Sequence, residues 1–442
     1  MTDFLYFLQN GKTQFHVAEL ARKYLQNQGF KELGLKELKS KLPAGRYFVS
    51  PFSSMVVPFV KGEEIKQVRI AGAHTDFPML KIKPNPDMTK QGYRQLNVEP
   101  YGGLIKETWF DRPLGLAGKV VCRGDSVFSP KVRLFDSEKP VCIIPNLAPH
   151  LKRGGKEGEM DVQKELIPLT DMQSDSKMTS NAALDASLNT SNSTPAADNL
   201  ITESYLLKKV AEKLQVPPES ILDYDLYLYI CDSPQNIGFE ECLISAPRID
   251  NISSVCAILH GLTAAADTAD STLMLGALFD NEEIGSRSKQ GADSLLLREI
   301  LDALLAGSDC SLTEDGFYLS VDVAHATHPN YSERSDITNS LILGKGVAIK
   351  TSSSQRYVCD SEAGAIISDL CMRNNIKLQR TVNRSGMPGG QTLGPILSSY
   401  LPMRACDIGI PVLAMHSARE LMHRFDYEQL LSLLTCFFST DK

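Results

Sequence analysis

The sequence lacks the features that are typical of membrane and nucleic-acid-binding proteins. No apolar run in its 442 residues approaches the ~18 residues that a membrane-spanning helix needs, so we expect no membrane association. The first residues, MTDFLYFLQNGKTQ, have no basic start followed by an apolar core, so we expect no secretory signal peptide. The formal net charge is −7 and no basic stripe occurs, which argues against nucleic-acid binding.

Cysteine pairs of the C-x-x-C type are also absent. The ten cysteines are scattered along the chain, and most lie in apolar runs such as VVC and SVCAIL. This distribution favours buried, reduced thiols over disulfides or a zinc knuckle, and it predicts a cytoplasmic protein.

Aromatic residues are missing from Asp136 to Ser204. Within this stretch, residues 172–199 are rich in Ser, Asn, Thr and Ala, which predicts a flexible loop. Short β-rich runs and Gly/Pro turns surround it, so residues 85–235 are predicted to form a β-rich domain. Residues 1–84 and 236–442 alternate between helix-like and strand-like segments, which predicts one discontinuous α/β domain whose strands share a single sheet.

Four apolar runs end at residues that can bind metal ions. The runs are VRIAGAH, LMLGALFD, FYLSVD and IPVLAMH, and the residues that close them are His74, Asp280, Glu282, Glu283, Asp322 and His416. A further acid, Asp250, lies where a helix is predicted to begin. Because sites in open α/β sheets form at the carboxyl ends of the strands, these side chains are predicted to meet.

Each of these residues, taken singly, has a simpler explanation. An aspartate at a strand end or a helix start is usually a cap or a turn former. Taken together, two histidines and several carboxylates predict a metal site, with Zn²⁺ as the preferred ion and Mn²⁺ or Co²⁺ as alternatives. Five or more ligands favour two ions ~3.5–4 Å apart that share a carboxylate. One acid of the adjacent pair Glu282–Glu283 would then bind metal and the other would act on water, and spacing alone leaves open which.

Six segments, in one order along the chain, resemble the aspartyl aminopeptidase family of dinuclear-zinc exopeptidases. They are AGAHTDFPMLKIKPNP, APRIDNISSV, FDNEEIGSRS, DVAHATHPNY, IKTSSSQRY and AMHSARE. The resemblance implies a metallo-aminopeptidase that releases the N-terminal residue of peptides and prefers Asp or Glu. It also implies a zinc-exopeptidase-type mixed sheet with helices on both faces, interrupted by a β-rich dimerisation domain.

The resemblance gives each member of the predicted cluster a role. It implies two divalent metal ions per subunit, zinc by preference, held by His74, Asp250, Glu283, Asp322 and His416, with Asp250 as the bridging ligand. Asp76 would orient His74 from behind. Glu282 would be the general base that activates a metal-bridging water, which assigns the adjacent pair.

Three further residues match substrate contacts in relatives, and a fourth is a candidate for the substrate pocket. Lys350 matches a lysine that faces the side chain of the first substrate residue, where an ammonium favours Asp or Glu. His325 matches a histidine near the substrate carbonyl, and Tyr357 is an additional pocket residue. His150 matches a histidine that reaches into the active site of a neighbouring subunit. One stretch, SGMPGGQTLGPI, departs from the family pattern, with Gly389 where many relatives carry a cysteine.

The resemblance also implies a homo-oligomer in which dimers assemble into a dodecamer. Two other enzyme functions stay open, an aminopeptidase for neutral first residues and a related dinuclear amidohydrolase, and the first-residue preference would separate them. A catalytically silent scaffold would have lost the base or a ligand, whereas every such position is filled here.

Overall fold

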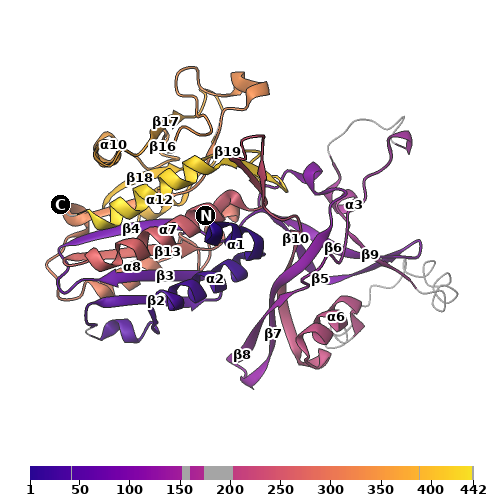
Figure 1. The fold of residues 1–442 in the computed structure, drawn as a ribbon. Helices are drawn as coiled ribbons and strands as arrows, with labels where there is room; N and C mark the ends of the chain where they lie inside the picture. The colour runs from indigo at the N-terminus through magenta and orange to yellow at the C-terminus, as the bar shows by residue number, and fades with distance from the viewer. Residues whose placement is uncertain (41, 152–159, 174–202, 388, 441–442) are drawn as a thin grey trace. The chain divides into compact units, whose positions relative to one another are not determined.

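The computed structural model describes residues 1–442 except 41, 152–159, 174–202, 388 and 441–442. The described residues form two compact units. Unit 1 consists of Met1–Phe77 and Ser233–Lys442, and unit 2 is the inserted stretch Pro78–Asp232 (Figure 1). The sequence places the corresponding boundaries at 84/85 and 235/236. The predicted loop at 172–199 lies outside the described residues from position 174 onward.

Unit 1 is built on a nine-stranded mixed sheet. In spatial order its strands are β1 (Lys31–Glu32), β2 (Gly45–Phe52), β3 (Met55–Lys61), β13 (Thr272–Phe279), β4 (Gln67–His74), β14 (Gly316–Val321), β18 (Arg404–Gly409), β16 (Val347–Thr351) and β17 (Leu378–Val382). The four central strands β13, β4, β14 and β18 run parallel to one another. They are buried almost completely, as the continuous apolar runs of parallel strands require.

Helices cover both faces of this sheet. They are α1 (Thr2–Asn10), α2 (Gln14–Asn27), α7 (Ile249–Ala265), α8 (Leu296–Leu304), α9 (Leu312–Asp315), α10 (Ser361–Arg373), α11 (Leu393–Ser398) and α12 (Arg424–Ser439). On β13, a Cβ at Gly276 would lie 3.0 Å from Ile258 of α7. The flanking Leu275 and Ala277 instead belong to the core cluster that contains Leu301 of α8. Because successive strand residues point to opposite faces, α7 and α8 lie on opposite sides.

A smaller sheet in unit 1 corrects the prediction of a single sheet. It contains β11 (Gln235–Ile237), β12 (Leu243–Ala246), β20 (Glu420–His423), β19 (Pro411–Leu413) and β15 (Ala324–His325), in that order. These strands have two to four residues each, too few to show a period in the sequence. The run IPVLAMH therefore ends in this small sheet, not in the large one.

One helix differs from the expectation about apolar runs. The helical stretch Ile249–Thr268 has 20 residues and a mean hydropathy of 1.2, which by length and composition alone would allow it to cross a membrane. Polar residues interrupt its apolar ones, so the sequence shows no continuous run. In the structure 83% of an 18-residue window within this stretch is buried, because it packs against α12 and the sheet. An all-round apolar helix of this kind is typical of a protein core.

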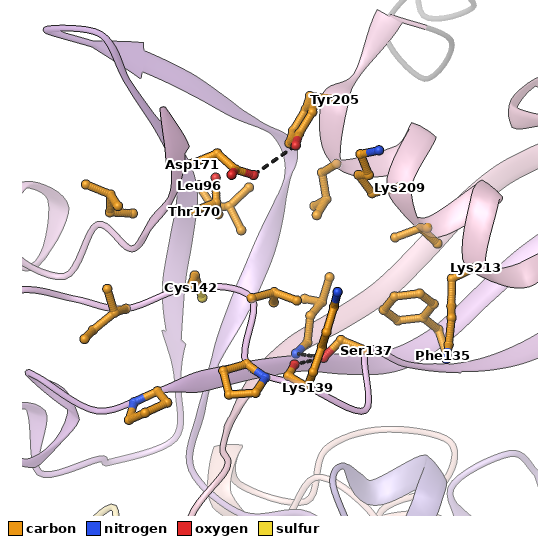
Figure 2. A pocket seen from close by; sticks show the side chains of 18 of the residues that line it. Leu96, Phe135, Ser137, Lys139, Cys142, Thr170, Asp171, Tyr205, Lys209 and Lys213 are labelled. Carbon is orange, nitrogen blue, oxygen red and sulfur yellow. Dashed lines mark hydrogen bonds between the residues drawn. The ribbon is translucent and has the colours of Figure 1, made fainter. Parts of the chain in front are cut away.

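Unit 2 contains an antiparallel six-stranded sheet. Its order is β8 (Ser129–Asp136), β7 (Leu114–Ser126), β10 (Ile221–Ile230), β5 (Met79–Lys90), β6 (Tyr93–Tyr101) and β9 (Leu169–Met172). The α-helices among the described residues of this unit are α3 (Val162–Glu165) and α6 (Tyr205–Leu214). Ser204 caps α6 by accepting the N–H of Leu207 at 3.2 Å. Residues of α6 and of four strands line a cavity of about 920 Å³, where the Tyr205 hydroxyl donates to Asp171 (Figure 2).

All ten cysteines are described and are free thiols, as predicted. The expectation that most are buried holds for half of them, namely Cys122, Cys142, Cys256, Cys371 and Cys406. The other five are partly exposed, because several lie in loops or near strand ends, where short apolar runs do not guarantee burial.

Candidate metal centre

The candidate site begins at the carboxyl ends of β4 and β13. These strands are parallel neighbours, and their last residues, His74 and Phe279, are register partners. The chain leaves β13 through Asp280 and Asn281, whose left-handed backbone (φ 64°) turns it into a short 3-10 helix at Glu282–Ile284. Glu282 and Glu283 therefore lie beside His74, as the pattern of strand ends predicts.

Two groups of ligands meet at Asp250. In group A, the Nε2 atom of His74 lies 3.4 Å from Oδ1 of Asp250 and 3.5 Å from Oδ1 of Asp322. In group B, the Nε2 atom of His416 lies 3.4 Å from Oδ2 of Asp250 and 3.4 Å from Oε2 of Glu283. Asp250 thus turns one carboxylate oxygen to each histidine, which is the arrangement of a carboxylate shared by two cations.

Buried carboxylate oxygens without a hydrogen bond indicate that this cluster fits cations. Among the described residues, Oδ1 of Asp250 and Oε1 of Glu283 are buried and accept no hydrogen bond, although Oδ1 lies 3.4 Å from Nε2 of His74. A buried carboxylate oxygen that accepts no hydrogen bond is costly unless a cation neutralises it. Imidazole nitrogens and carboxylate oxygens are the donors that Zn²⁺ prefers outside thiolate sites. The residues of groups A and B therefore fit divalent metal ions.

The pKa shifts at the site reflect crowded negative charge. Burial, together with the charges of Asp322 and other nearby acids, raises the pKa of Glu282 to about 8. Burial and the charge of Asp250 raise the pKa of Glu283 well above its usual range. Burial alone would lower the pKa of His416, but contacts with Asp250 and Glu283 raise it to about 10. Positive charge is therefore strongly favoured between these carboxylates.

Asp76 holds both acids of the adjacent pair through their backbone. Its Oδ1 accepts the N–H of Glu282 at 3.1 Å, and its Oδ2 accepts the N–H of Glu283 at 3.2 Å. The same carboxylate lies 3.4 Å from Nδ1 of His74. Asp76 is fully buried, so one side chain fixes three positions of the site.

Glu420, at the start of β20, holds residues of group B through their backbone N–H groups. Sequence patterns do not identify this residue. Its Oε2 accepts the N–H of Asp250, and its Oε1 accepts the N–H of His416, both at 3.0 Å. The side chain is 2% exposed. The only sequence signal is an acid shortly after the histidine in AMHSARE, because its two partners are far apart in the chain.

Replacing Glu420 with Gln should weaken ion binding at group B. The amide leaves one acceptor oxygen for two N–H donors, so Asp250 and His416 lose a common support. We expect the affinity of group B for zinc to fall about ten- to a hundredfold, and that of group A, which shares Asp250 but not His416, to fall less. Calorimetric titration of zinc into the metal-stripped protein measures this. Glu299→Gln, on the exposed face of α8, is the matched control, and equal affinities in both variants would contradict the expectation.

A cavity of about 480 Å³ opens onto both ligand groups. His325, Lys350 and Tyr357 line it, together with every residue of groups A and B. His150 belongs to unit 2, where it is exposed in the short helix Pro149–Leu151, and it is not among the described residues that line this cavity.

Lys350 is anchored beside the site. Its ammonium donates to the carbonyl of Val323 at 3.0 Å and lies 3.7 Å from Oδ2 of Asp322. It also lies 5.3 Å from the ring centroid of Tyr357. Burial would lower its pKa, but the charges of Asp322 and Asp407 raise it above the usual value, so the group stays charged.

The stretch that departs from the family pattern forms part of the cavity wall. A Cβ at Gly389 would lie 1.8 Å from Nδ2 of Asn383, so Asn383 occupies the space that a side chain at position 389 would need. Asn383 and Gly390 both line the cavity. The space that a cysteine side chain would need is therefore filled by an amide from six residues earlier in the same connection.

Comparisons with known proteins agree over the whole chain. The family model Aminopeptidase I zinc metalloprotease (M18) matches residues 7–438. A probable M18 family aminopeptidase 2 from Clostridium novyi (strain NT) is 38% identical over 430 residues, which is 95% of this chain and 94% of the relative. A second probable M18 family aminopeptidase 2, from Ectopseudomonas mendocina (strain ymp), is 35% identical, and the matched region covers 98% of this chain and 96% of the relative. The cryo-EM structure of the Ape4 and Nbr1 complex contains a similar chain, with a TM-score of 0.88 and 30% identity. The match covers 99% of this chain and 85% of that chain.

Proposed function

Because this chain belongs to the M18 family of aminopeptidase I zinc metalloproteases, we propose that it releases N-terminal Asp and Glu residues from peptides. The family itself makes the chain a metal-dependent aminopeptidase. It includes the aspartyl aminopeptidases that the six segments resemble. The observation that carries the proposed mechanism is the position of Asp250, which turns one oxygen to each of two histidine-containing ligand groups.

Five residues would hold two metal ions, zinc by preference and Mn²⁺ or Co²⁺ as alternatives. His74 and Asp322 would bind one ion, Glu283 and His416 the other, and Asp250 both. When bound, such ions polarise a carbonyl and lower the pKa of water. A small amidohydrolase could use the same ligands, but the cavity of about 480 Å³ has room for a peptide terminus.

Glu282 is the proposed general base. Its side chain reaches the cavity beside His74 and Glu283, and Asp76 fixes its backbone N–H. Glu282 would take a proton from the attacking water and deliver it to the nitrogen of the leaving amine. Burial and neighbouring acids raise the pKa of Glu282, whereas bound cations would lower it and so keep the carboxylate ready to accept a proton.

Lys350 is the proposed selector of the first residue. Among the described residues that line the cavity, it is the one lysine or arginine. Two of its three N–H donors face the carbonyls of Asp322 and Val323. The remaining positive charge favours a carboxylate in the substrate over a neutral or basic side chain.

Replacing Lys350 with Ala should lower kcat/KM for Asp- and Glu-amide substrates by about ten- to a hundredfold, while turnover of Leu-amide changes little. The range corresponds to about 1.4–2.7 kcal/mol for one partly screened charge pair. Initial rates with Asp-, Glu-, Leu- and Lys-amides measure it, with the exposed Lys345→Ala as matched control. Fast turnover of Leu-amide by the unaltered protein would favour the neutral aminopeptidase instead.

We also propose that the protein acts as a homo-oligomer. The fold is shared with the S. cerevisiae mApe1 dodecamer, at a TM-score of 0.82 and 24% identity. Unit 2 would pair subunits into dimers that assemble further. His150, exposed in that unit, would then be free to contribute to the active site of a neighbouring subunit.

A further inference from the structure

Two thiols face each other close in the chain to Tyr357, a residue that lines the candidate-site cavity. Cys406 lies in β18, and Cys359 lies in the segment between β16 and α10. The two residues form an isolated antiparallel bridge. Their Sγ atoms are 2.9 Å apart.

Hydrogen bonds between the neighbouring residues Val358 and Asp407 hold the two cysteines opposite each other. The N–H of Asp407 donates to the carbonyl of Val358 at 2.8 Å, and the N–H of Val358 donates to Oδ2 of Asp407. The first bond flanks the cysteines, so they are opposite residues without a mutual hydrogen bond. In such pairs the Cα atoms are ~4.5 Å apart, which lies within the range that a disulfide can span.

The two thiols differ in access. Cys359 is half-buried, whereas Cys406 is completely buried. Contact with Cys406 lowers the pKa of Cys359, and the same contact together with burial raises the pKa of Cys406 well above its usual range. A small oxidant would therefore meet Cys359 first, because reactivity follows exposure and thiolate content.

We propose that Cys359 and Cys406 form an oxidation site, at which a peroxide converts the two thiols into an intramolecular disulfide. The thiolate of Cys359 would attack a peroxide oxygen, break the O–O bond and become a sulfenic acid; the hydroxide that leaves takes up the proton lost by the thiol and becomes one water. The thiol of Cys406 would then attack the sulfenic sulfur, forming the S–S bond and releasing a second water. Two thiols are oxidised and one hydrogen peroxide is reduced, so the step balances.

The bond would act on the substrate cavity through Tyr357. This residue lines the cavity and lies two positions before Cys359. Its segment is joined to β18 through the hydrogen bonds between Val358 and Asp407, and the bridge joins residues 47 positions apart. A disulfide would add a covalent tie between β18 and this part of the wall. We expect the oxidised protein to melt several degrees higher, with reversal by dithiothreitol.

The test treats the zinc-loaded full chain with hydrogen peroxide and counts thiols after denaturation. The expected result is a fall from ten thiols to eight, with one cross-linked peptide pair that contains Cys359 and Cys406 in a non-reducing digest. Cys359→Ser and Cys406→Ser should each prevent the cross-link, whereas Cys310→Ser, at a partly exposed cysteine elsewhere, should leave it intact.

Several results would overturn the proposal. Ten titrated thiols after treatment, a cross-link between other cysteines, or sulfinic acid on Cys359 without a cross-link would each do so. The digest of the unaltered protein decides alone if a serine variant does not fold. If the oxidised protein melts no higher than the reduced one, the inference that the disulfide stabilises the connection between β18 and the segment of Tyr357 is wrong.

Discussion

Replacing Glu282 with Gln is expected to lower kcat by about 10²–10⁴-fold, the usual contribution of a general base. Gln has nearly the same shape but cannot accept the proton of the attacking water at neutral pH. The backbone N–H of residue 282 still donates to Asp76, so the turn that carries it should keep its form. Both ions should stay bound, because groups A and B are complete without this side chain.

Glu283→Gln is the informative partner of this variant. It changes the neighbouring residue by the same few atoms, but it removes an oxygen that lies 3.4 Å from Nε2 of His416. We expect it to lose an ion from group B, whereas Glu282→Gln keeps full metal content. Metal analysis after gel filtration, together with initial rates, separates the two. Full activity of Glu282→Gln would eliminate the proposed base, and metal loss in that variant would reverse the two assignments.

Replacing Asp250 with Asn is expected to weaken both ligand groups at once. Asn offers one oxygen, and its NH₂ group cannot bind a cation, so it serves one group at most. We expect metal content to fall at both groups and activity to fall by about a thousandfold or more. This range corresponds to about 4 kcal/mol of lost carbonyl polarisation.

The matched control is Asp302→Asn, on the exposed face of α8, where the carboxylate pairs only with Arg298 among the described residues. It should retain metal and activity. Metal content and initial rates, measured at several zinc concentrations, distinguish a weakened site from a damaged fold. Two tightly bound ions per chain in Asp250→Asn would show that Asp250 does not bridge them.

Sequence patterns predict the candidate ligands at strand ends better than the residues that hold those ligands in place. His74 and Asp322 close or follow long parallel strands, whose apolar runs mark both the strand and its end. His416 lies in a short, irregular segment with a left-handed backbone (φ 67°), so its strand was assigned to the wrong sheet. Glu420 could not be predicted, because its two partners are backbone N–H groups that only the folded chain brings together.

The residues proposed to contact the substrate are harder to predict from sequence patterns for a similar reason. Lys350 lies in β16, one residue from its end, and nothing in its neighbourhood shows that the side chain points toward Asp322. The replacement of a side chain at Gly389 by Asn383 is equally invisible, since it depends on how the single connection between β17 and α11 folds back on itself. Such pairings depend on tertiary packing, which local periodicity does not describe.

The central position of β4 has a consequence for biosynthesis. This strand is made early, yet its two neighbours, β13 and β14, follow only after the whole of unit 2 has been translated. Both edges of β4 therefore lack their native partners on the ribosome until Thr272–Val321 has emerged. The last of the proposed ligands, His416, follows close to the end of the chain. The proposed metal site can therefore be completed only near the end of synthesis, and until then the unpaired edges of β4 are open to non-native pairing.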